Sequence, residues 1–264
     1  MIGVFDSGLG GLSVLAAVAR ALPGADLLYF ADTAHLPYGN KSDDFIRRRV
    51  LAIGAHLAAR GCTTLVVACN TATAAAVAEL RTEHPGLSVV GVEPGVKPAA
   101  ASSLSRRIAV LVTESTAKSQ RLAQLIRAHA GDVEVLVEAC PGWATRVETL
   151  HALDPDHEFA DEVAARIRPL LDAGVDRLVL GCTHYSFLSA MLEPLLAGRA
   201  EVVDVAEAVA RQVVRLRSER QQGSGTLQLY ASATPERLQA ALPALDLQWL
   251  TPRIGRAAQL VELG

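Results

Sequence analysis

Two cysteines in this chain follow apolar runs and precede polar side chains. Residues 65–68 lead into Cys69-Asn70-Thr71, and residues 178–181 lead into Cys182-Thr183-His184. Each pattern predicts a buried strand and then the start of a helix, whose N-terminal end stabilises negative charge and favours a thiolate. The sequence therefore indicates two reactive thiols at the carboxyl ends of strands, where open α/β sheets bind their ligands.

Three simpler interpretations of these cysteines remain possible from the residues alone. A metal site has little support, because no Cys-x-x-Cys or His-x-x-x-His spacing accompanies Cys182 and His184. A single nucleophilic Cys182 with His184 as its base is sound chemistry, but it leaves Cys69 without a role. Thiols are also common in protein cores, and we assign that structural role to Cys62 and Cys140.

The fourth interpretation uses both thiols for proton transfer. Inverting a carbon centre needs a base on one face and an acid on the other, and a thiolate and a thiol can exchange these roles after each turnover. A free thiol has a pKa of about 8.5 that such sites often lower, so either sulfur can act near neutral pH. Asp6 and His184 are candidate helpers of Cys69 and Cys182, respectively, and we expect no cofactor and no metal.

Composition limits the class of protein. Half of the 264 residues are hydrophobic, which is enough for one large or two ordinary α/β domains. The net charge of −3 gives no electrostatic footprint for nucleic acid. The N-terminal segment lacks the basic start of a signal peptide, and no apolar run has the length of a membrane span. We expect a cytoplasmic protein with reduced thiols and no membrane partner.

Strand and helix patterns alternate along the whole chain, so the fold class is α/β with mostly parallel sheets. Asp6 ends the first strand and precedes a glycine-rich loop, and on position alone it is a candidate helix cap. Proline-rich residues 94–98 and a turn at 221–225 are candidate hinges. The apolar residues 247–250 predict a last strand near the end of the sequence.

Several motifs together carry a family resemblance. They occur at residues 6–12 (DSGLGGL), 37–42 (PYGNKS), 68–72 (ACNTA), 139–141 (ACP) and 180–185 (LGCTHY). In this order they resemble the glutamate racemase family of the aspartate/glutamate racemase superfamily.

The resemblance implies two pseudo-symmetric domains, each with a mostly parallel sheet flanked by helices, and an active site in the cleft between them. The first domain would comprise residues 1–94 and 208–264, and the second residues 95–207. It also implies cofactor-independent interconversion of L-glutamate and D-glutamate, which supplies D-glutamate for peptidoglycan and hence for cell wall biogenesis and cell shape. We expect a homodimer on the same ground.

The resemblance also assigns roles to individual residues. Cys69 would take the α-proton of D-glutamate and Cys182 that of L-glutamate, and Glu148 would assist the second thiol. Substrate binding would fall to side chains and backbone amides at Asp6, Ser7, Tyr38, Gly39, Asn70, Thr71, Thr183 and His184. Two alternatives stay open: a racemase of aspartate or another amino acid, and a non-catalytic protein that binds an anionic metabolite.

Overall fold

The chain forms two compact units. The structure, a computed structural model, describes residues 1–149, 157–216 and 223–263. One unit comprises Met1–Val92 with Ala206–Gly264, and the other Glu93–Val205. The sequence placed these boundaries at 94/95 and 207/208, slightly later in the chain. Residues 221 and 222 of the predicted turn at 221–225 lie outside the described residues.

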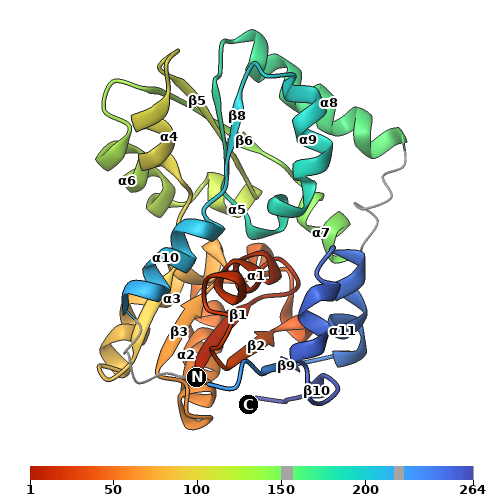
Figure 1. Cartoon of the computed structure of the whole chain (residues 1–264). Helices are drawn as coiled ribbons and strands as arrows, with labels where there is room; N and C mark the ends of the chain where they lie inside the picture. Colours follow the sequence, from red (N-terminus) through yellow and green to blue (C-terminus); the bar gives the residue numbers. More distant parts are fainter. Residues whose placement is uncertain (150–156, 217–222, 264) are drawn as a thin grey trace. The chain divides into compact units, whose positions relative to one another are not determined.

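The first unit contains a six-stranded parallel sheet in the order β10-β9-β2-β1-β3-β4 (Figure 1). Its strands are β1 (Ile2–Asp6), β2 (Leu27–Ala31), β3 (Thr64–Val67), β4 (Ser88–Gly91), β9 (Leu227–Ala231) and β10 (Gln259–Leu260). Phe5 of β1 lies beside Phe30 of β2 and Val67 of β3. This register brings Asp6, the last residue of β1, and the segment that carries Cys69 after β3 to the carboxyl ends of neighbouring strands.

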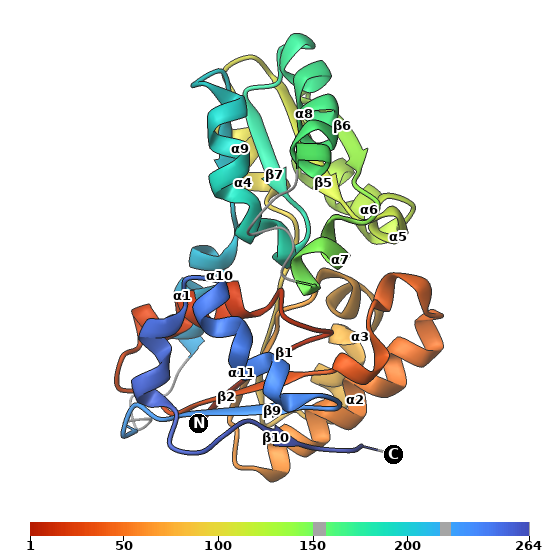
Figure 2. The same cartoon turned by 90° about the vertical axis from the view of Figure 1, so that its right-hand side faces the viewer.

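Helices cover both faces of this sheet. They are α1 (Leu12–Ala21), α2 (Asp43–Ala59), α3 (Asn70–Glu83), α10 (Ala206–Leu216) and α11 (Pro235–Ala244). The apolar sides of α2 and α3 form one core cluster with β1, β2 and β3, which includes Tyr38 and Cys69. Figure 2 shows α1 and α10 on the other side of the sheet, where they pack together.

The second unit contains a four-stranded parallel sheet in the order β6-β5-β7-β8. Its strands are β5 (Arg107–Val112), β6 (Glu134–Ala139), β7 (Arg177–Leu180) and β8 (Glu201–Val203). Leu111 lies between Leu180 and Glu138, and the Gly181 amide donates to the Leu111 carbonyl over 2.8 Å. The segments that carry Cys140 and Cys182 therefore leave the sheet at one edge.

The helices of the second unit also lie on both faces of its sheet. They are α4 (Val96–Ser102), α5 (Glu114–Ala117), α6 (Gln120–His129), α7 (Trp143–Glu148), α8 (His157–Asp172) and α9 (Ser189–Leu196). α4 and α6 share a core cluster with alternate residues of β5. α8 and α9 pack against each other on the other side of the sheet (Figure 1).

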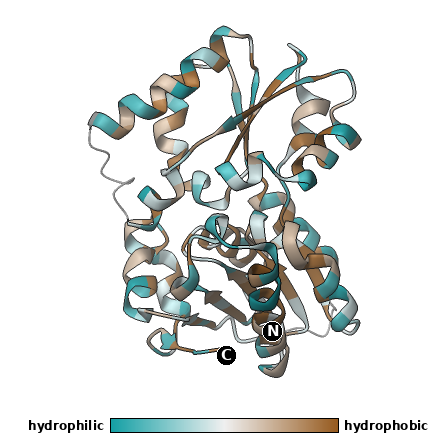
Figure 3. Ribbon diagram, turned by 180° about the vertical axis from the view of Figure 1, so that it is seen from behind, coloured by the Kyte–Doolittle hydropathy of each residue, from teal (hydrophilic) through white to brown (hydrophobic). Residues whose placement is uncertain are grey.

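Burial follows the pattern that the sequence predicts for parallel sheets. In Figure 3 most of the strands are hydrophobic, and much of the hydrophilic colour lies on the helices and loops. All five residues of β1 and of β2 are buried, because helices cover both faces of a parallel sheet. The expected α/β class with two parallel sheets is confirmed.

Two segments show local structure that the sequence did not predict. The predicted strand at 247–250 is wrong: these residues enter the 3-10 helix η4 (Gln248–Arg253), in which Pro252 cannot donate to a ladder. The Leu247 amide donates instead to the Leu242 carbonyl over 2.7 Å. The crossing at 94–98 runs into helix α4, whose Pro98 lies in the first turn, where proline is tolerated.

Two negative findings hold for the described ranges. No helix there is long and apolar enough to cross a membrane. The same residues contain no cluster of three or more His, Cys, Asp or Glu side chains that could hold a metal ion.

Candidate active site

Cys69 lies at the N-terminus of α3 in the first unit. Its backbone is extended, and its sulfur accepts a hydrogen bond from the Ala72 amide at 3.5 Å. The side chain is 7% exposed. The positive end of the 14-residue helix α3 therefore meets the sulfur and stabilises its thiolate.

The glycine-rich loop after β1 brings a hydroxyl to this sulfur. Ser7 Oγ lies 3.9 Å from Cys69 Sγ and 3.4 Å from Asp6 Oδ1. Asp6 also accepts a hydrogen bond from the Gly8 amide over 2.8 Å, which closes a tight turn. The N-cap of α1 is Gly11, with no side-chain cap, so the interpretation of Asp6 as the cap of that helix is wrong.

Gly11 is required by the close packing under this loop. A Cβ at this position would lie 2.6 Å from the Asp6 Cβ and 3.0 Å from the Ala68 Cβ. We expect Gly11→Ala to lower the free energy of unfolding by about 1–3 kcal/mol, because overpacking displaces the loop. Urea unfolding would measure this change. Gly24→Ala is the control, since nothing lies within 4 Å of its Cβ, and equal stability of the two variants would contradict the prediction.

The two polar residues after Cys69 open α3. Asn70 is buried, and its Oδ1 has no hydrogen-bond partner among the described residues. A buried acceptor without a partner costs about 1–3 kcal/mol, so this oxygen is suited to a ligand that donates a hydrogen bond. Thr71 is half-buried beside it.

Tyr38 and Gly39 lie in the short 3-10 helix η2 (Tyr38–Asn40). The Tyr38 ring is 2% exposed and belongs to the core cluster that contains Cys69. Its hydroxyl donates to Asp32 Oδ2 over 2.6 Å. Burial, followed by the negative charge of Asp32, raises the pKa of the Tyr38 phenol well above its ordinary value. The phenol therefore stays protonated.

Three buried side chains, those of Cys182, His184 and Glu148, form a line in the second unit. Cys182 Sγ lies 3.5 Å from His184 Nδ1, and His184 Nε2 lies 2.5 Å from Glu148 Oε1. The three side chains belong to residues that are 9%, 6% and 8% exposed, in that order. Thr183, also buried, lies between the thiol and the imidazole in sequence. This Cys–His–Glu arrangement orients the imidazole between a sulfur and a carboxylate.

The charges in this line change the protonation of His184. Burial alone would lower the pKa of the imidazole, but the charge of Cys182 and the hydrogen bonds to Cys182 and Glu148 raise it well above 6.5. A protonated imidazole donates from both nitrogens. His184 can therefore stabilise a Cys182 thiolate and bind Glu148 at the same time.

The surroundings of the two thiols are not copies of each other. The helix expected directly after Cys182 is instead the 3-10 helix η3 (Thr183–Leu188), and α9 begins only at Ser189. Cys182 accepts no side-chain capping bond there. Its positive partner is the imidazolium, whereas that of Cys69 is the N-terminus of α3.

The other two cysteines have different environments. Burial raises the pKa of the Cys62 thiol to about 11. Burial and the charge of Glu138 raise that of Cys140 to about 12. Both thiols are therefore neutral near pH 7 and fit the structural role expected from the sequence.

The supporting roles of two aromatic residues were missed in the sequence. The Tyr185 hydroxyl donates to the Cys140 carbonyl over 3.1 Å, and the Tyr185 ring lies 5.5 Å from that of Trp143. Trp143 opens α7, the helix that ends with Glu148, so the contact between these rings joins α7 to η3, the element that carries His184. The available signal was an aromatic residue three positions after Cys140 and another three positions after Cys182.

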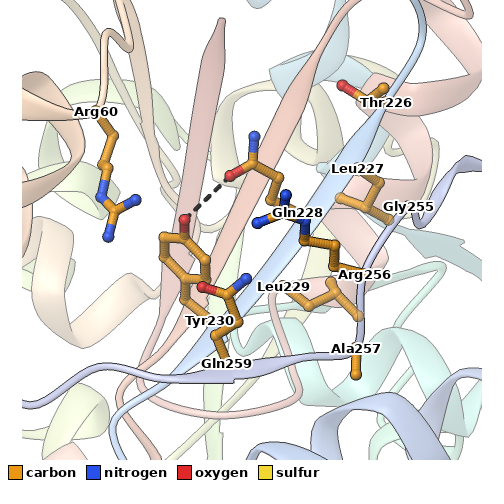
Figure 4. Close-up of a pocket in the computed structure, with 10 residues that line it drawn as sticks. All are labelled: Arg60, Thr226, Leu227, Gln228, Leu229, Tyr230, Gly255, Arg256, Ala257 and Gln259. Atoms are coloured by element: carbon orange, nitrogen blue, oxygen red, sulfur yellow. Dashed lines mark hydrogen bonds between the residues drawn. The ribbon is translucent and has the colours of Figure 1, made fainter.

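A pocket of about 330 Å³ opens along β9 in the first unit (Figure 4). The Tyr230 hydroxyl donates there to Gln228 Oε1 over 3.0 Å, and the Arg60 guanidinium lies over the Tyr230 ring. No residue assigned above to catalysis or substrate binding lines this pocket. It is separate from the residues around Cys69.

Comparison with known proteins places the chain in a family. Residues 2–213 match the model of the Asp/Glu/Hydantoin racemase family. The chain belongs to this family, and the prediction of a racemase, and hence of an isomerase, is confirmed.

Its relatives within the family are glutamate racemases. That of Pseudomonas aeruginosa strain UCBPP-PA14 is 44% identical over 255 residues, which cover 95% of this chain and 94% of that protein. That of Ectopseudomonas mendocina strain ymp is 44% identical over 248 residues, 92% of this chain and 94% of that protein. The resemblance to glutamate racemases that the motifs indicate is therefore confirmed.

Solved structures agree in fold. Escherichia coli glutamate racemase, solved with L-glutamate and the activator UDP-MurNAc-ala, is similar with a TM-score of 0.86 and 29% identity, covering all of this chain and 98% of that one. The glutamate racemase from Aquifex pyrophilus has a TM-score of 0.76 and 34% identity, covering 99% and 98% of the two chains.

Proposed function

We propose that this protein interconverts L-glutamate and D-glutamate without a cofactor, using Cys69 and Cys182 as a thiolate–thiol pair. The observation that carries the proposal is the buried line from Cys182 through His184 to Glu148, in a chain whose relatives are glutamate racemases. The product D-glutamate would supply peptidoglycan synthesis. We also propose a cytoplasmic location, as expected from the composition, and a homodimer, as expected from the family resemblance.

The proton balance of the reaction follows from the two thiols. With D-glutamate, the Cys69 thiolate removes the α-proton and the Cys182 thiol delivers a proton to the opposite face of the α-carbon. Cys69 then becomes the thiol and Cys182 the thiolate, next to the His184 imidazolium. The reaction of L-glutamate runs in the opposite sense. Each turnover leaves the enzyme ready for the other enantiomer.

The residues beside each of the two cysteines are suited to the charged groups of an amino acid. The buried Asn70 Oδ1 would accept a hydrogen bond from the α-ammonium group of the substrate. Ser7, Thr71 and Thr183 offer hydroxyls, and Gly39 offers a backbone amide, for the two carboxylates. Tyr38 stays a neutral phenol and can present its ring and oxygen without repelling an anion.

The helpers of the two thiols have separate tasks in this proposal. Asp6 and Ser7 would relay a proton to and from Cys69, since Ser7 Oγ lies 3.9 Å from the sulfur. His184 would stabilise the thiolate of Cys182, and Glu148 would hold the imidazole in its charged form.

The decisive experiment is α-proton exchange in deuterated water. Purified protein is incubated with L-glutamate or D-glutamate, circular dichroism follows inversion, and proton NMR follows loss of the α-proton signal. We expect both enantiomers to exchange and to reach the racemic mixture, because one face of the carbon loses a proton and the other gains a deuteron.

A panel of amino acids under the same conditions tests the choice of substrate. Exchange of aspartate but not of glutamate would replace the proposed substrate within the same family. Absence of exchange with every amino acid would favour a binding protein whose thiols only pack.

A further inference from the structure

A buried carboxylate organises the segment that carries Tyr38. Asp32 follows β2 and is 0% exposed. Its Oδ2 accepts from the Tyr38 hydroxyl at 2.6 Å and from Arg49 Nε at 3.1 Å. Its Oδ1 accepts from Arg49 Nη2 at 2.9 Å and lies 3.1 Å from His35 Nδ1. Both oxygens of Asp32 are thus shared between an arginine fork and the Tyr38 segment.

The charge of this carboxylate is maintained although it is buried. Burial would raise the pKa of Asp32, but hydrogen bonds from Arg49, Tyr38 and His35 lower it below its ordinary value. A buried ion pair stabilises a structure only where its remaining donors are satisfied. Nε and Nη2 of Arg49 bind Asp32, so the partner of its remaining nitrogen, Nη1, decides whether the pair is fully satisfied.

Nη1 of Arg49 donates a hydrogen bond to the C-terminal segment. The Arg49 side chain is 7% exposed, and its Nη1 donates to the Leu263 carbonyl over 2.8 Å. The same segment is fixed by the Val261 amide, which donates to the Ala231 carbonyl over 2.9 Å. Val261 and Leu263 also pack against the core cluster that contains Tyr38 and Cys69. The Leu263 carbonyl thus gives the third nitrogen of the Arg49 guanidinium a hydrogen-bond partner.

We propose that Asp32 and Arg49 are positioning residues of the reaction, which hold Tyr38 in place for substrate, and that the Leu263 carbonyl anchors Arg49 in this role. The inference rests on the proposed function, because Tyr38 is a substrate-binding residue only there. Asp32 and Arg49 act through Tyr38 and do not touch the reacting carbon. The C-terminal segment thereby becomes part of the support of the site.

Arg49→Lys tests the fork while it keeps the positive charge. An ammonium group cannot reproduce the planar bidentate contact and the third bond to Leu263. We expect KM for both enantiomers to rise about 10-fold while kcat changes less than about 2-fold, since binding and not proton transfer is weakened. Hydrogen–deuterium exchange of residues 33–42, followed by mass spectrometry, should become about 10-fold faster.

Arg253→Lys is the matched control in the same unit. Like Arg49, Arg253 donates hydrogen bonds from all three guanidinium nitrogens. Its acceptors are the backbone carbonyls of Gly225, Ala25 and Ala19, at 2.7, 2.6 and 3.3 Å. We expect this variant to leave KM and the exchange of residues 33–42 unchanged even if it lowers stability. Equal changes in both arginine variants, or none in Arg49→Lys, would overturn the proposal and leave Asp32–Arg49 a purely structural pair.

A double variant shows whether Arg49 acts through Tyr38. Tyr38→Phe removes the hydroxyl that binds Asp32, so Arg49→Lys should add less than about 2-fold to KM in that background. Independent, multiplicative effects would contradict the proposed route. The hydrogen-exchange measurement needs no turnover, so faster exchange in Arg49→Lys with a wild-type protein inert toward glutamate would reject the proposed function and retain the network.

Discussion

Cys69→Ser and Cys182→Ser are each expected to lower the rate of racemisation by about 10³-fold, because serine is a far weaker acid than cysteine and cannot serve as the base near neutral pH. The loss in kcat/KM must be equal in both directions for each variant, since L- and D-glutamate have equal free energies in solution. Circular dichroism from either pure enantiomer measures this loss.

Exchange of the α-proton separates the two thiols where racemisation cannot. Cys182→Ser retains Cys69, so we expect D-glutamate to exchange its α-proton in deuterated water without inversion, and L-glutamate to exchange about 10²-fold or more slowly. Cys69→Ser should show the reverse preference. Wild-type racemisation by either variant would exclude that thiol from the reaction.

The remaining cysteines supply matched controls. Cys62→Ser lies in the unit of Cys69, and Cys140→Ser in that of Cys182. Their thiols have a pKa of about 11 and about 12, so they are neutral and take no part in proton transfer. We expect both control variants to racemise glutamate within about 3-fold of the wild-type rate, apart from any loss of stability.

Glu148→Gln is expected to lower racemisation by about 10²-fold, because the carboxylate both orients His184 and holds its proton. The Glu148 Oε1 lies 2.5 Å from His184 Nε2, and its charge contributes to the raised pKa of the imidazole. In the variant this pKa falls, so the imidazolium that stabilises the Cys182 thiolate is lost at a lower pH. Proton NMR titration of His184, assigned with a His184→Asn variant, measures the change.

The raised pKa of His184 should also make the free energy of unfolding depend on pH. The pKa of His184 is raised in the folded protein above its ordinary 6.5, so its contribution to stability is fully present below that pH and is lost as the pH rises through the folded-state value. Glu148→Gln should therefore destabilise the protein more near pH 6 than at alkaline pH. Thermal unfolding at several pH values measures this difference.

Glu138→Gln is the control for this prediction. Glu138 lies in the same unit, and its Oε1 pairs with Arg166 Nη1 at 2.9 Å. We expect this variant to leave the titration of His184 unchanged. An unaltered His184 titration in Glu148→Gln would mean that the carboxylate does not control the imidazole.

The α/β class and the strands that precede Cys69 and Cys182 could be predicted from the amino-acid sequence alone. Apolar runs before Cys69 and Cys182 predict strands. In the structure, β3 ends at Val67 and β7 at Leu180, each two residues before its cysteine. Strand periodicity and strand-end chemistry are local properties, which is why they are readable in one dimension. The same local reasoning was wrong at 247–250, where an apolar run forms a 3-10 helix around Pro252.

The polar groups that accompany each of these two cysteines depend on contacts between segments that are distant in the sequence. Position along the chain made Asp6 a helix cap, but the folded loop places Ser7 Oγ between Asp6 Oδ1 and the Cys69 sulfur. Glu148 entered only through the family resemblance, and its contact with His184 depends on how α7 packs against η3.

The Asp32–Arg49–Leu263 contacts had no signal in the sequence. They join the end of β2, the middle of α2 and the C-terminal segment. The distances between such side chains are set by long-range strand register and helix packing, which spacing along the chain does not encode. The sequence therefore indicates where the proposed reactive thiols lie, and the packing of distant segments selects the side chains that contact them.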